Sequence, residues 1–372
     1  MKTPLLASRI LVGLLFIVSG WIKANDPLGF SYKLEEYFNV FHMGYLVPAS
    51  LILSVMISVS EIVLGFAALS GTRMRTGAWL LLMLILFFTF LTFFSAYFNK
   101  VTDCGCFGDA LHLRPWQSFS KDLILLLLIL IIFSGRKKIT PVFSPFPANA
   151  ALLAVFLASS SYAIWCYRHL PPVDFRPYKA GTDILAKTKG TPDKLKYFYN
   201  LKNKKSGETK EFTSWPENWE SEWDYVNYRT EITEKGIEPA IHDFSITDAD
   251  GNDHTEEITG ASGFSFLLVA YDLRQTNTES YTAANALSQI CTKENIPFTA
   301  LTASPAAETD RFRHEVQAMY DFYFCDATAL KTMIRSNPGL ILLKDGKVTK
   351  MWHYNDIPSF EKVKEKYFDK LK

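Results

Sequence analysis

Two cysteines, separated by a single glycine, are the residues in this chain best suited to chemistry. Cys104 and Cys106 flank Gly105, and Asp103 and Asp109 bracket the set. A disulfide closed across one intervening residue bends the backbone sharply, so we expect it to be strained and more oxidising than a structural bridge. Strained and accessible disulfides are the ones that exchange. The pair therefore predicts thiol–disulfide redox chemistry.

Two other interpretations of the same pair stay open. The disulfide could simply staple a turn, or the two thiolates could contribute to a metal site with His112 nearby. The sequence offers no second cysteine or histidine pair at a usual zinc spacing, so we assign no metal. Asp103 and Asp109 would raise the pKa of the thiols by like-charge repulsion, which argues against a highly reactive thiolate unless they point elsewhere.

The three remaining cysteines are isolated in the sequence. Cys291 follows Leu287 and Ile290 on a helical pattern, and we expect it to fill an apolar core. Cys325 follows an aromatic pair in a predicted strand and is also expected in the core. If Cys325 or Cys166 were exposed, either could receive a disulfide from the Cys104–Cys106 loop.

Composition divides the chain into two halves. Of 372 residues, 48% are hydrophobic, 15% aromatic and 21% charged, and the net charge is +1. These values exclude a disordered polymer, a collagen and a nucleic-acid binder that relies on bulk positive charge. Residues 1–170 hold 13 Lys and Arg against 7 Asp and Glu, whereas residues 171–372 hold 26 against 31. An apolar, basic half thus precedes an acidic half with the composition of a water-exposed domain.

Five apolar stretches in the first half are long enough to cross a bilayer. A transmembrane helix needs about 20 mostly apolar residues, and Gly77–Phe98 is the clearest, with 22 uncharged residues. The other predicted spans are Pro4–Ile22, Val47–Ser70, Trp116–Ser134 and Ala148–Tyr167. The first stretch alternatively fits a signal peptide that is cleaved after the small residues at 18–20.

Basic residues in the short loops predict the orientation in the cytoplasmic membrane. Arg73 and Arg75 follow the second span, and a basic cluster at 136–138 follows the fourth. Positive charge favours the cytoplasmic side. We therefore expect a cytoplasmic N-terminus, loops 23–46 and 99–115 outside, and an extracytoplasmic or periplasmic acidic half.

Two charged residues lie within the predicted spans. Arg9 and Glu61 differ in expected depth by roughly 6 Å, which an extended arginine can bridge. We therefore predict a buried Arg9–Glu61 pair. Its expected role is to fix how two helices dock, while a role in proton or quinone chemistry stays open.

Three motifs carry a resemblance to a known family. They are the Asp103–Asp109 run, Glu61-Ile62-Val63-Leu64-Gly65 and Ser19-Gly20-Trp21-Ile22-Lys23. Over about residues 1–140 the chain resembles the MauE branch of the DoxX-like membrane proteins. MauE-type proteins are associated with methylamine utilisation and with disulfide formation in partner proteins. The resemblance implies Cys104 and Cys106 as the redox pair and, by likeness to vitamin K epoxide reductase bundles, a membrane quinone as electron acceptor. The long outer extension departs from the family and argues against a role limited to methylamine metabolism.

A polar region, residues 171–238, follows the fifth span at 141–170. Residues 196–212 alternate in a way that predicts a β-hairpin around Ser206-Gly207. Three tryptophans at steps of four, Trp215, Trp219 and Trp223, fit one face of a short helix that begins near Pro216. We expect them to pack this region against the membrane surface or the next domain.

Residues 239–372 predict an α/β domain. The expected order is strand 240–247, strand 264–271, helix 278–293, strand 298–303, helix 309–320, hairpin 339–353 and helix 358–371. This order resembles the TlpA and peroxiredoxin-like thioredoxin folds, in which Pro338 would be the cis-proline. Those families place Cys-x-x-Cys after the first core strand, where this chain has Asp272–Asn277 and no thiol.

The sequence thus predicts a multi-domain protein in the lipid bilayer: an all-α bundle of about five transmembrane helices and an extracytoplasmic thioredoxin-like α/β domain. Our first functional hypothesis is thiol–disulfide redox or assembly of extracytoplasmic partner proteins through Cys104 and Cys106. Supporting candidates are Arg9, Glu61, Asp103, Asp109, Cys325 and Pro338. The alternative is a non-catalytic membrane-anchored scaffold whose thioredoxin-like domain binds a partner.

Overall fold

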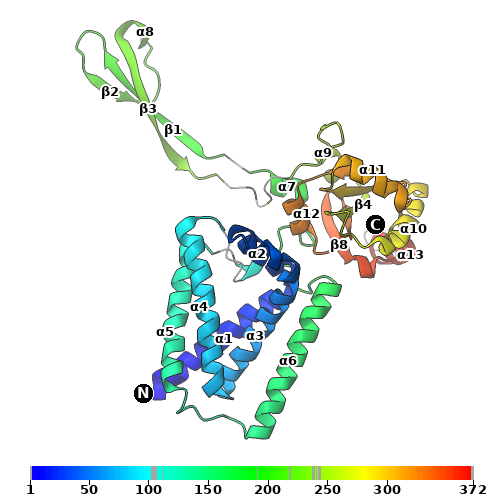
Figure 1. The fold of residues 1–372 in the computed structure, drawn as a ribbon. Helices are drawn as coiled ribbons and strands as arrows, with labels where there is room; N and C mark the ends of the chain where they lie inside the picture. Colours follow the sequence, from blue (N-terminus) through cyan, green and yellow to red (C-terminus); the bar gives the residue numbers. More distant parts are fainter. Residues whose placement is uncertain are drawn as a thin grey trace.

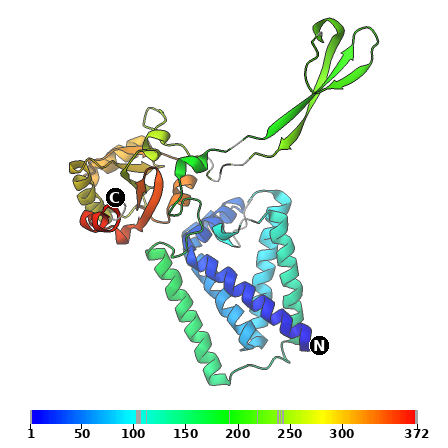
Figure 2. The same cartoon turned by 180° about the vertical axis from the view of Figure 1, so that it is seen from behind.

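The computed structural model describes residues 2–369 except 102–106, 112, 191, 218, 237–238, 240 and 242–243. The chain forms three parts: a helical bundle, an α/β domain above one end of it, and a long β-sheet arm that projects away from both (Figures 1 and 2).

Five long apolar helices form the bundle: α1 (Lys2–Asn25), α3 (Ser50–Ser70), α4 (Met74–Phe98), α5 (Pro115–Gly135) and α6 (Pro145–Arg168). Each is long and apolar enough to span a membrane, which confirms the five predicted spans. Helix α6 runs alongside α3 at one side of the bundle and is the least buried of the five (Figure 1).

Glycines set the packing of α1 against α3. A Cβ added at Gly13 would lie 2.9 Å from the carbonyl oxygen of Gly65, and one at Gly20 would lie 2.7 Å from that of Ser58. The two backbones therefore approach each other closely at two levels. This contact fixes the register of the two helices and places Gly20 level with Glu61.

A shorter helix covers the end of the bundle next to the α/β domain, which we call the outer end by its position alone. Helix α2 (Pro27–Val40) begins at Asp26, whose side chain accepts a hydrogen bond from Gly29 N at 2.9 Å. A proline at the first helical position further favours a helix start. Phe30, Leu34 and Tyr37 are buried beneath it. A 3₁₀ turn, η1 (Gly44–Ala49), then leads into α3.

The α/β domain contains a five-stranded sheet in the order β6-β5-β4-β7-β8. Its strands are β4 (Phe264–Ala270), β5 (Phe298–Thr302), β6 (Phe322–Phe324), β7 (Gly339–Lys344) and β8 (Lys347–His353). Strands β4, β5 and β6 run parallel, whereas β7 and β8 form an antiparallel hairpin. This arrangement confirms the predicted thioredoxin-like order.

Helices cover the two faces of this sheet. The main ones are α10 (Tyr281–Lys293), α11 (Ala306–Glu315), α12 (Ala327–Met333) and α13 (Phe360–Val363), which continues into the π-helical turn Lys364–Phe368. Phe266, Leu268 and Leu340 form a core with α10 and α13. On the opposite face of the sheet, Leu267 and Ile341 are buried against α12. Side chains in or near the short helices α7 (Ile184–Thr188) and α9 (Thr255–Thr259) complete this second core.

Two predicted elements of this domain differ in the structure. In the described part of residues 240–247, Ile241 and Ile246 are buried, but the only β-pairing is at Thr247, through isolated bridges. The backbone N–H of Ile246 is instead satisfied by Thr255 Oγ1. The helix expected at 309–320 is α11 and ends at Glu315, shortly before the positive φ of Gln317.

The arm contains strands β1 (Lys194–Asn203), β2 (Thr209–Phe212) and β3 (Trp223–Glu234) in the order β2-β1-β3, with the one-turn helix α8 (Trp219–Glu222) at its tip. The predicted hairpin is confirmed, but the third strand was not predicted. The expectation that the tryptophans pack against the next domain is wrong, whereas packing against the membrane surface stays a prediction. Trp215 packs on Trp219 with ring centroids 4.5 Å apart, and Trp223 packs on Phe212 within the arm.

Candidate functional site

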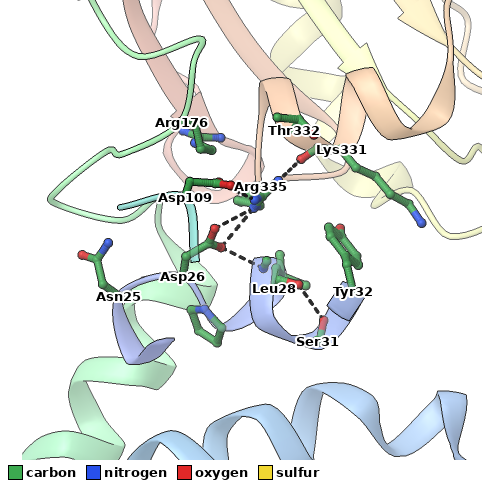
Figure 3. A network of polar contacts seen from close by, with 12 residues as sticks. Asn25, Asp26, Leu28, Ser31, Tyr32, Asp109, Arg176, Lys331, Thr332 and Arg335 are labelled. Carbon is green, nitrogen blue, oxygen red and sulfur yellow. Dashed lines mark hydrogen bonds and ion pairs between the residues drawn. The ribbon is translucent and has the colours of Figure 1, made fainter. Parts of the chain in front are cut away.

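One arginine joins the α/β domain to the outer end of the bundle (Figure 3). Arg335, just after α12, donates from Nε to both carboxylate oxygens of Asp26 at 3.0 and 2.9 Å. Its Nη2 donates to Asp109 at 3.1 Å, and its Nη1 donates to the carbonyl of Lys331. We call Asp26, Asp109 and Arg335 the junction clamp. It draws together three segments that are far apart in the sequence.

Burial and charge act in opposite directions on this arginine. Arg335 is only 7% exposed, and burial alone would lower its pKa. The negative charges of Asp26 and Asp109 outweigh that effect and raise the pKa of Arg335 above its ordinary value. The guanidinium therefore stays charged, and the clamp is a buried ionic contact and not a surface salt bridge.

The start of α2 leaves room for the clamp. A Cβ at Gly29 would lie 2.8 Å from Arg335 Nη2 and would also collide with the Asp26 carboxylate. Asp26 thus both caps α2 and binds Arg335, and Gly29 is the residue that makes the two roles compatible.

Aromatic residues support the junction beside the clamp. The hydroxyls of Tyr32 on α2 and Tyr271 after β4 lie 3.0 Å apart, and Lys331 lies over the Tyr32 ring at 4.7 Å. Burial raises the pKa of both tyrosines, so their hydroxyls are neutral at physiological pH. A neutral hydrogen bond therefore accompanies the ionic clamp.

The segment that follows α6 ties the two domains together a second time. Asn25 at the end of α1 donates to the carbonyl of Val173 at 2.7 Å and accepts from Tyr162 on α6 at 2.9 Å. On the domain side, Arg176 pairs with Asp174 and donates to the carbonyl of Met333 at 3.1 Å. The thioredoxin-like domain is thus held by its own tether as well as by the clamp.

A cavity of about 590 Å³ lies at this junction. Its volume is within the usual range for ligand sites. Acidic and basic side chains line it, among them Asp26, Lys33, Glu36, Asp174, Lys331 and Arg335. Gly108 and Asp109 also line it, so the segment directly after the Cys-Gly-Cys run opens onto the cavity.

A second group of charges lies inside the bundle, next to the same loop. Lys23 donates to both carboxylate oxygens of Glu61 at 2.9 Å, and both side chains are almost fully buried. Lys121 pairs with buried Asp122 at 2.6 Å. These four residues and Phe107 surround a cavity of about 30 Å³. Phe107, the residue that follows Cys106, therefore lies beside one buried and one partly buried ion pair.

The predicted Arg9–Glu61 pair is wrong. Arg9 donates to the backbone carbonyls of Ala68 and Leu69 at 2.9 and 3.1 Å, which are free acceptors at the C-terminal end of α3. The glycine contacts place Glu61 level with Gly20, which is 11 residues beyond Arg9 and thus about 16 Å along the helix axis. Lys23 lies about one helical turn from Gly20 on α1, and it therefore forms the ion pair with Glu61 in place of Arg9.

The other predicted site residues fall into separate places. Asp103, Cys104 and Cys106 lie outside the described residues, whereas Asp109 is in the clamp. Cys166 is buried on α6. Cys325 is buried beneath the sheet, and burial raises its pKa to about 12, so it is not an exchange partner in this fold. Cys291 is buried, as expected.

Pro338 has the cis peptide bond that was expected, after Asn337. The neighbouring position, where related folds carry two thiols, is closed by hydrogen bonds. Asn277 N donates to the carbonyl of Asn337 at 3.0 Å, and Asn337 Nδ2 donates to the carbonyl of Asp272 at 2.7 Å. This loop pair is therefore a structural element in the present chain.

Sequence reasoning missed Lys23, Asp26, Lys121, Asp122 and Arg335. Two signals were available. The Asp26-Pro27 dipeptide is typical of a helix start, and Lys121-Asp122 places two charges inside an apolar run. No local signal pointed to Arg335, because its partners are 226 and 309 residues away.

The fold and the site define a class: a multi-pass membrane protein that carries a thioredoxin-like domain at one end of its helical bundle. Residues 1–135, which contain the first four spans, match the family model of the methylamine utilisation protein MauE. No curated protein matches the chain. The likeness to the wider DoxX group stays a prediction.

A solved structure of a thioredoxin-like protein from Bacteroides caccae ATCC 43185 is similar at 8% sequence identity. The alignment covers 90% of this chain and 87% of that chain, with a TM-score of 0.23. That overall likeness is too weak to carry an argument. The thioredoxin-like assignment depends instead on the order β5-β4-β7-β8, with its parallel pair followed by an antiparallel hairpin.

Proposed function

We propose that this MauE-type protein exchanges disulfides with extracytoplasmic partner proteins through Cys104 and Cys106, with the loop and the thioredoxin-like domain outside the cytoplasmic membrane. One observation carries the proposal. Gly108 and Asp109, two and three residues after Cys106, line the 590 Å³ junction cavity. A cavity of this size gives a partner segment access to this end of the cysteine loop.

The exchange balances without a further reactant. A thiolate of the partner attacks one sulfur of the Cys104–Cys106 disulfide, the S–S bond breaks, and a mixed disulfide forms. A second partner thiolate then attacks the mixed disulfide and releases the partner in oxidised form. Two electrons pass to the cysteine pair, and the two protons lost by the partner thiols end on Cys104 and Cys106.

The junction clamp lessens one obstacle to this chemistry. A free Asp109 carboxylate would repel a developing thiolate and raise the thiol pKa. Arg335 binds Asp109 at 3.1 Å and offsets part of its charge, since the same arginine also pairs with Asp26. The repulsion that a leaving thiolate meets is thereby reduced.

Two cavities formed by the described residues of the bundle bear on the membrane quinone that the family resemblance implies. The cavity beneath Phe107, about 30 Å³, has room for one water and not for a quinone ring. A groove of about 580 Å³ between α3, α4 and α6 is apolar, with Ser60 and Ser160 as its polar residues. Neither cavity combines the size of a quinone ring with a position at the loop, and we propose no step through a quinone.

Replacing both Cys104 and Cys106 with serine tests the proposal. In intact membranes, a membrane-impermeant thiol reagent should label the wild-type pair only after mild reduction, and the double variant should shift partner proteins toward free thiols. Cys166→Ser is the matched control, because that cysteine is buried on α6. Unchanged partner oxidation in the double variant would refute the proposal.

A non-catalytic scaffold is the second candidate. The closed Asn277–Asn337 contact at the position without thiols favours it. In that case Cys104→Ser/Cys106→Ser would leave partner oxidation intact. Arg335→Met would instead undock the thioredoxin-like domain from the bundle and weaken binding of the partner. The two variants therefore separate the candidates.

A further inference from the structure

The β-sheet arm has two chemically different faces. On one face, Arg229 pairs with Glu211 at 2.7 and 2.9 Å and with Glu231 at 2.7 Å, and Asn200 donates to Asn227 at 2.7 Å. These charges and amides satisfy one another. We call this the polar face, and it needs no partner beyond water.

The opposite face is aromatic and aliphatic. Strand register places Leu195 opposite Ile232, Tyr199 opposite Tyr228 and Leu201 opposite Tyr225. Rings from the loop before β3 extend this surface, since Trp215 contacts both Tyr199 and Tyr225, at centroid distances of 4.7 and 6.1 Å. The aromatic face comprises Leu195, Tyr197, Tyr199, Trp215, Tyr225, Tyr228 and Ile232.

This face is uncovered among the described residues. Leu195, Tyr197, Trp215, Tyr225, Tyr228 and Ile232 are 42, 42, 41, 48, 56 and 58% exposed. The arm extends away from both domains, so neither covers it (Figures 1 and 2). A continuous exposed apolar surface of this kind marks an interaction site.

The exposed area matches the requirement for a dimer. The six exposed fractions together amount to almost three whole side chains, or roughly 570 Å² at about 200 Å² for each side chain. Two such faces packed together bury roughly 1,100 Å², which exceeds the approximately 1,000 Å² that a specific interface needs.

Charge permits the same pairing. Residues 192–236 carry eight Lys and Arg and nine Asp and Glu, a net charge of −1. Two arms therefore do not repel each other strongly, and the polar face remains toward solvent when the aromatic faces meet. Twofold contacts between identical surfaces are the commonest way in which soluble domains associate.

We propose that the aromatic face of the arm binds the aromatic face of a second copy of this chain. The contact joins two membrane-anchored molecules at a distance from the junction clamp. It is independent of the chemistry of Cys104 and Cys106.

Cysteine cross-linking on neighbouring residues tests the proposal in native membranes. In the full chain with Cys104 and Cys106 replaced by serine, Tyr228→Cys should give a covalent dimer with a short bismaleimide reagent. Asn227→Cys is the matched control, because Asn227 is adjacent and exposed but lies on the polar face. Equal cross-linking of both variants, or none at Tyr228, would overturn the proposal.

The mass of the purified full chain in lipid nanodiscs gives the second measurement. The wild type should be dimeric, and Tyr197→Glu/Tyr228→Glu should raise the dimer dissociation constant at least tenfold. Lys196→Ala on the polar face should leave it unchanged. A monomeric wild type, or a double variant that dimerises as well as the wild type, contradicts the proposal. Protection of Tyr228→Cys from labelling in membranes without a covalent homodimer would instead assign the face to a different protein.

Discussion

Two buried cations, Lys23 and Arg335, hold different parts of this protein together with the same chemistry. Each contacts both oxygens of a carboxylate at about 3 Å. Lys23 binds a residue 38 positions away and fixes how two neighbouring helices pack. Arg335 binds a residue 309 positions away and fixes how one domain sits on another.

The comparison shows that the surroundings determine what a buried ion pair does. The Lys23–Glu61 pair lies between helices that glycines already hold in close contact. The junction clamp instead lies beside a pair of hydrogen-bonded tyrosines, Tyr32 and Tyr271, and it adds a second carboxylate, Asp109. Loss of the first pair should thus destabilise the bundle, whereas loss of the clamp should separate two intact domains.

The largest effect is expected inside the bundle. Glu61→Gln leaves Lys23 charged and buried, which should lower the free energy of unfolding by about 3–5 kcal/mol. Lys23→Met/Glu61→Met, which removes both charges, should recover most of that loss. Denaturation of the full chain in detergent micelles measures both. A single variant as stable as the wild type would show that the pair is not buried as described.

The next effect concerns docking. Arg335→Met leaves Asp26 and Asp109 unpaired and should cost about 2–5 kcal/mol of interaction between the domains. Protease cleavage of the tether at 169–176 should accelerate while the unfolding of each domain is unchanged. Arg335→Lys, which keeps the charge but loses the planar fork, should lie between wild type and Arg335→Met. A variant whose tether remains as resistant as that of the wild type would contradict a docking role.

His353 is a buried group that stays neutral, unlike the two buried cations Lys23 and Arg335. His353 is 2% exposed, burial lowers its pKa to about 4, and its Nδ1 accepts a hydrogen bond from Asn355 N. The unfolded chain therefore takes up this proton first, near pH 6.5, and stability falls as the pH drops toward 4. At pH 5 the loss is about 2 kcal/mol. His353→Gln should remove this part of the pH dependence, measured by thermal unfolding of the full chain.

The smallest effect tests the neutral contact at the junction. Tyr271→Phe removes the hydrogen bond to Tyr32 and should weaken docking by about 1 kcal/mol. Tether proteolysis should then accelerate far less than in Arg335→Met. Equal acceleration in the two variants would show that the ionic clamp is not the main contact between the domains.

Local patterns explain which parts of the fold were predictable. The five spans follow from apolar runs, and the hairpin Gly339–His353 follows from alternating residues around Asp345-Gly346. Helix α2 was missed because residues 23–46 were assigned to a loop between two spans, although Phe30, Leu34 and Tyr37 follow helical spacing. The third strand of the arm was missed because tryptophans at steps of four matched a helix. In the structure, a four-residue helix ends before Trp223 begins the strand.

Site contacts were less predictable because they depend on register and on distant segments. The Arg9–Glu61 prediction used depth in the membrane alone, and the glycine contacts between α1 and α3 shifted the true pairing to Lys23. Arg335 is an ordinary arginine near the end of a short helix in the sequence. Only the folded arrangement brings it to Asp26 and Asp109.

The order of synthesis gives the clamp a consequence of its own. Asp26 leaves the ribosome 309 residues before Arg335, which at about 5–20 residues per second is a delay of roughly 15–60 s. During that interval the bundle can insert into the membrane and the Cys104–Cys106 loop can cross it. Asp26 and Asp109 are then already synthesised, but Arg335 is not yet present to pair with them. A truncated chain that ends before Arg335 would retain this uncovered outer end, so closure of the clamp marks the completed molecule.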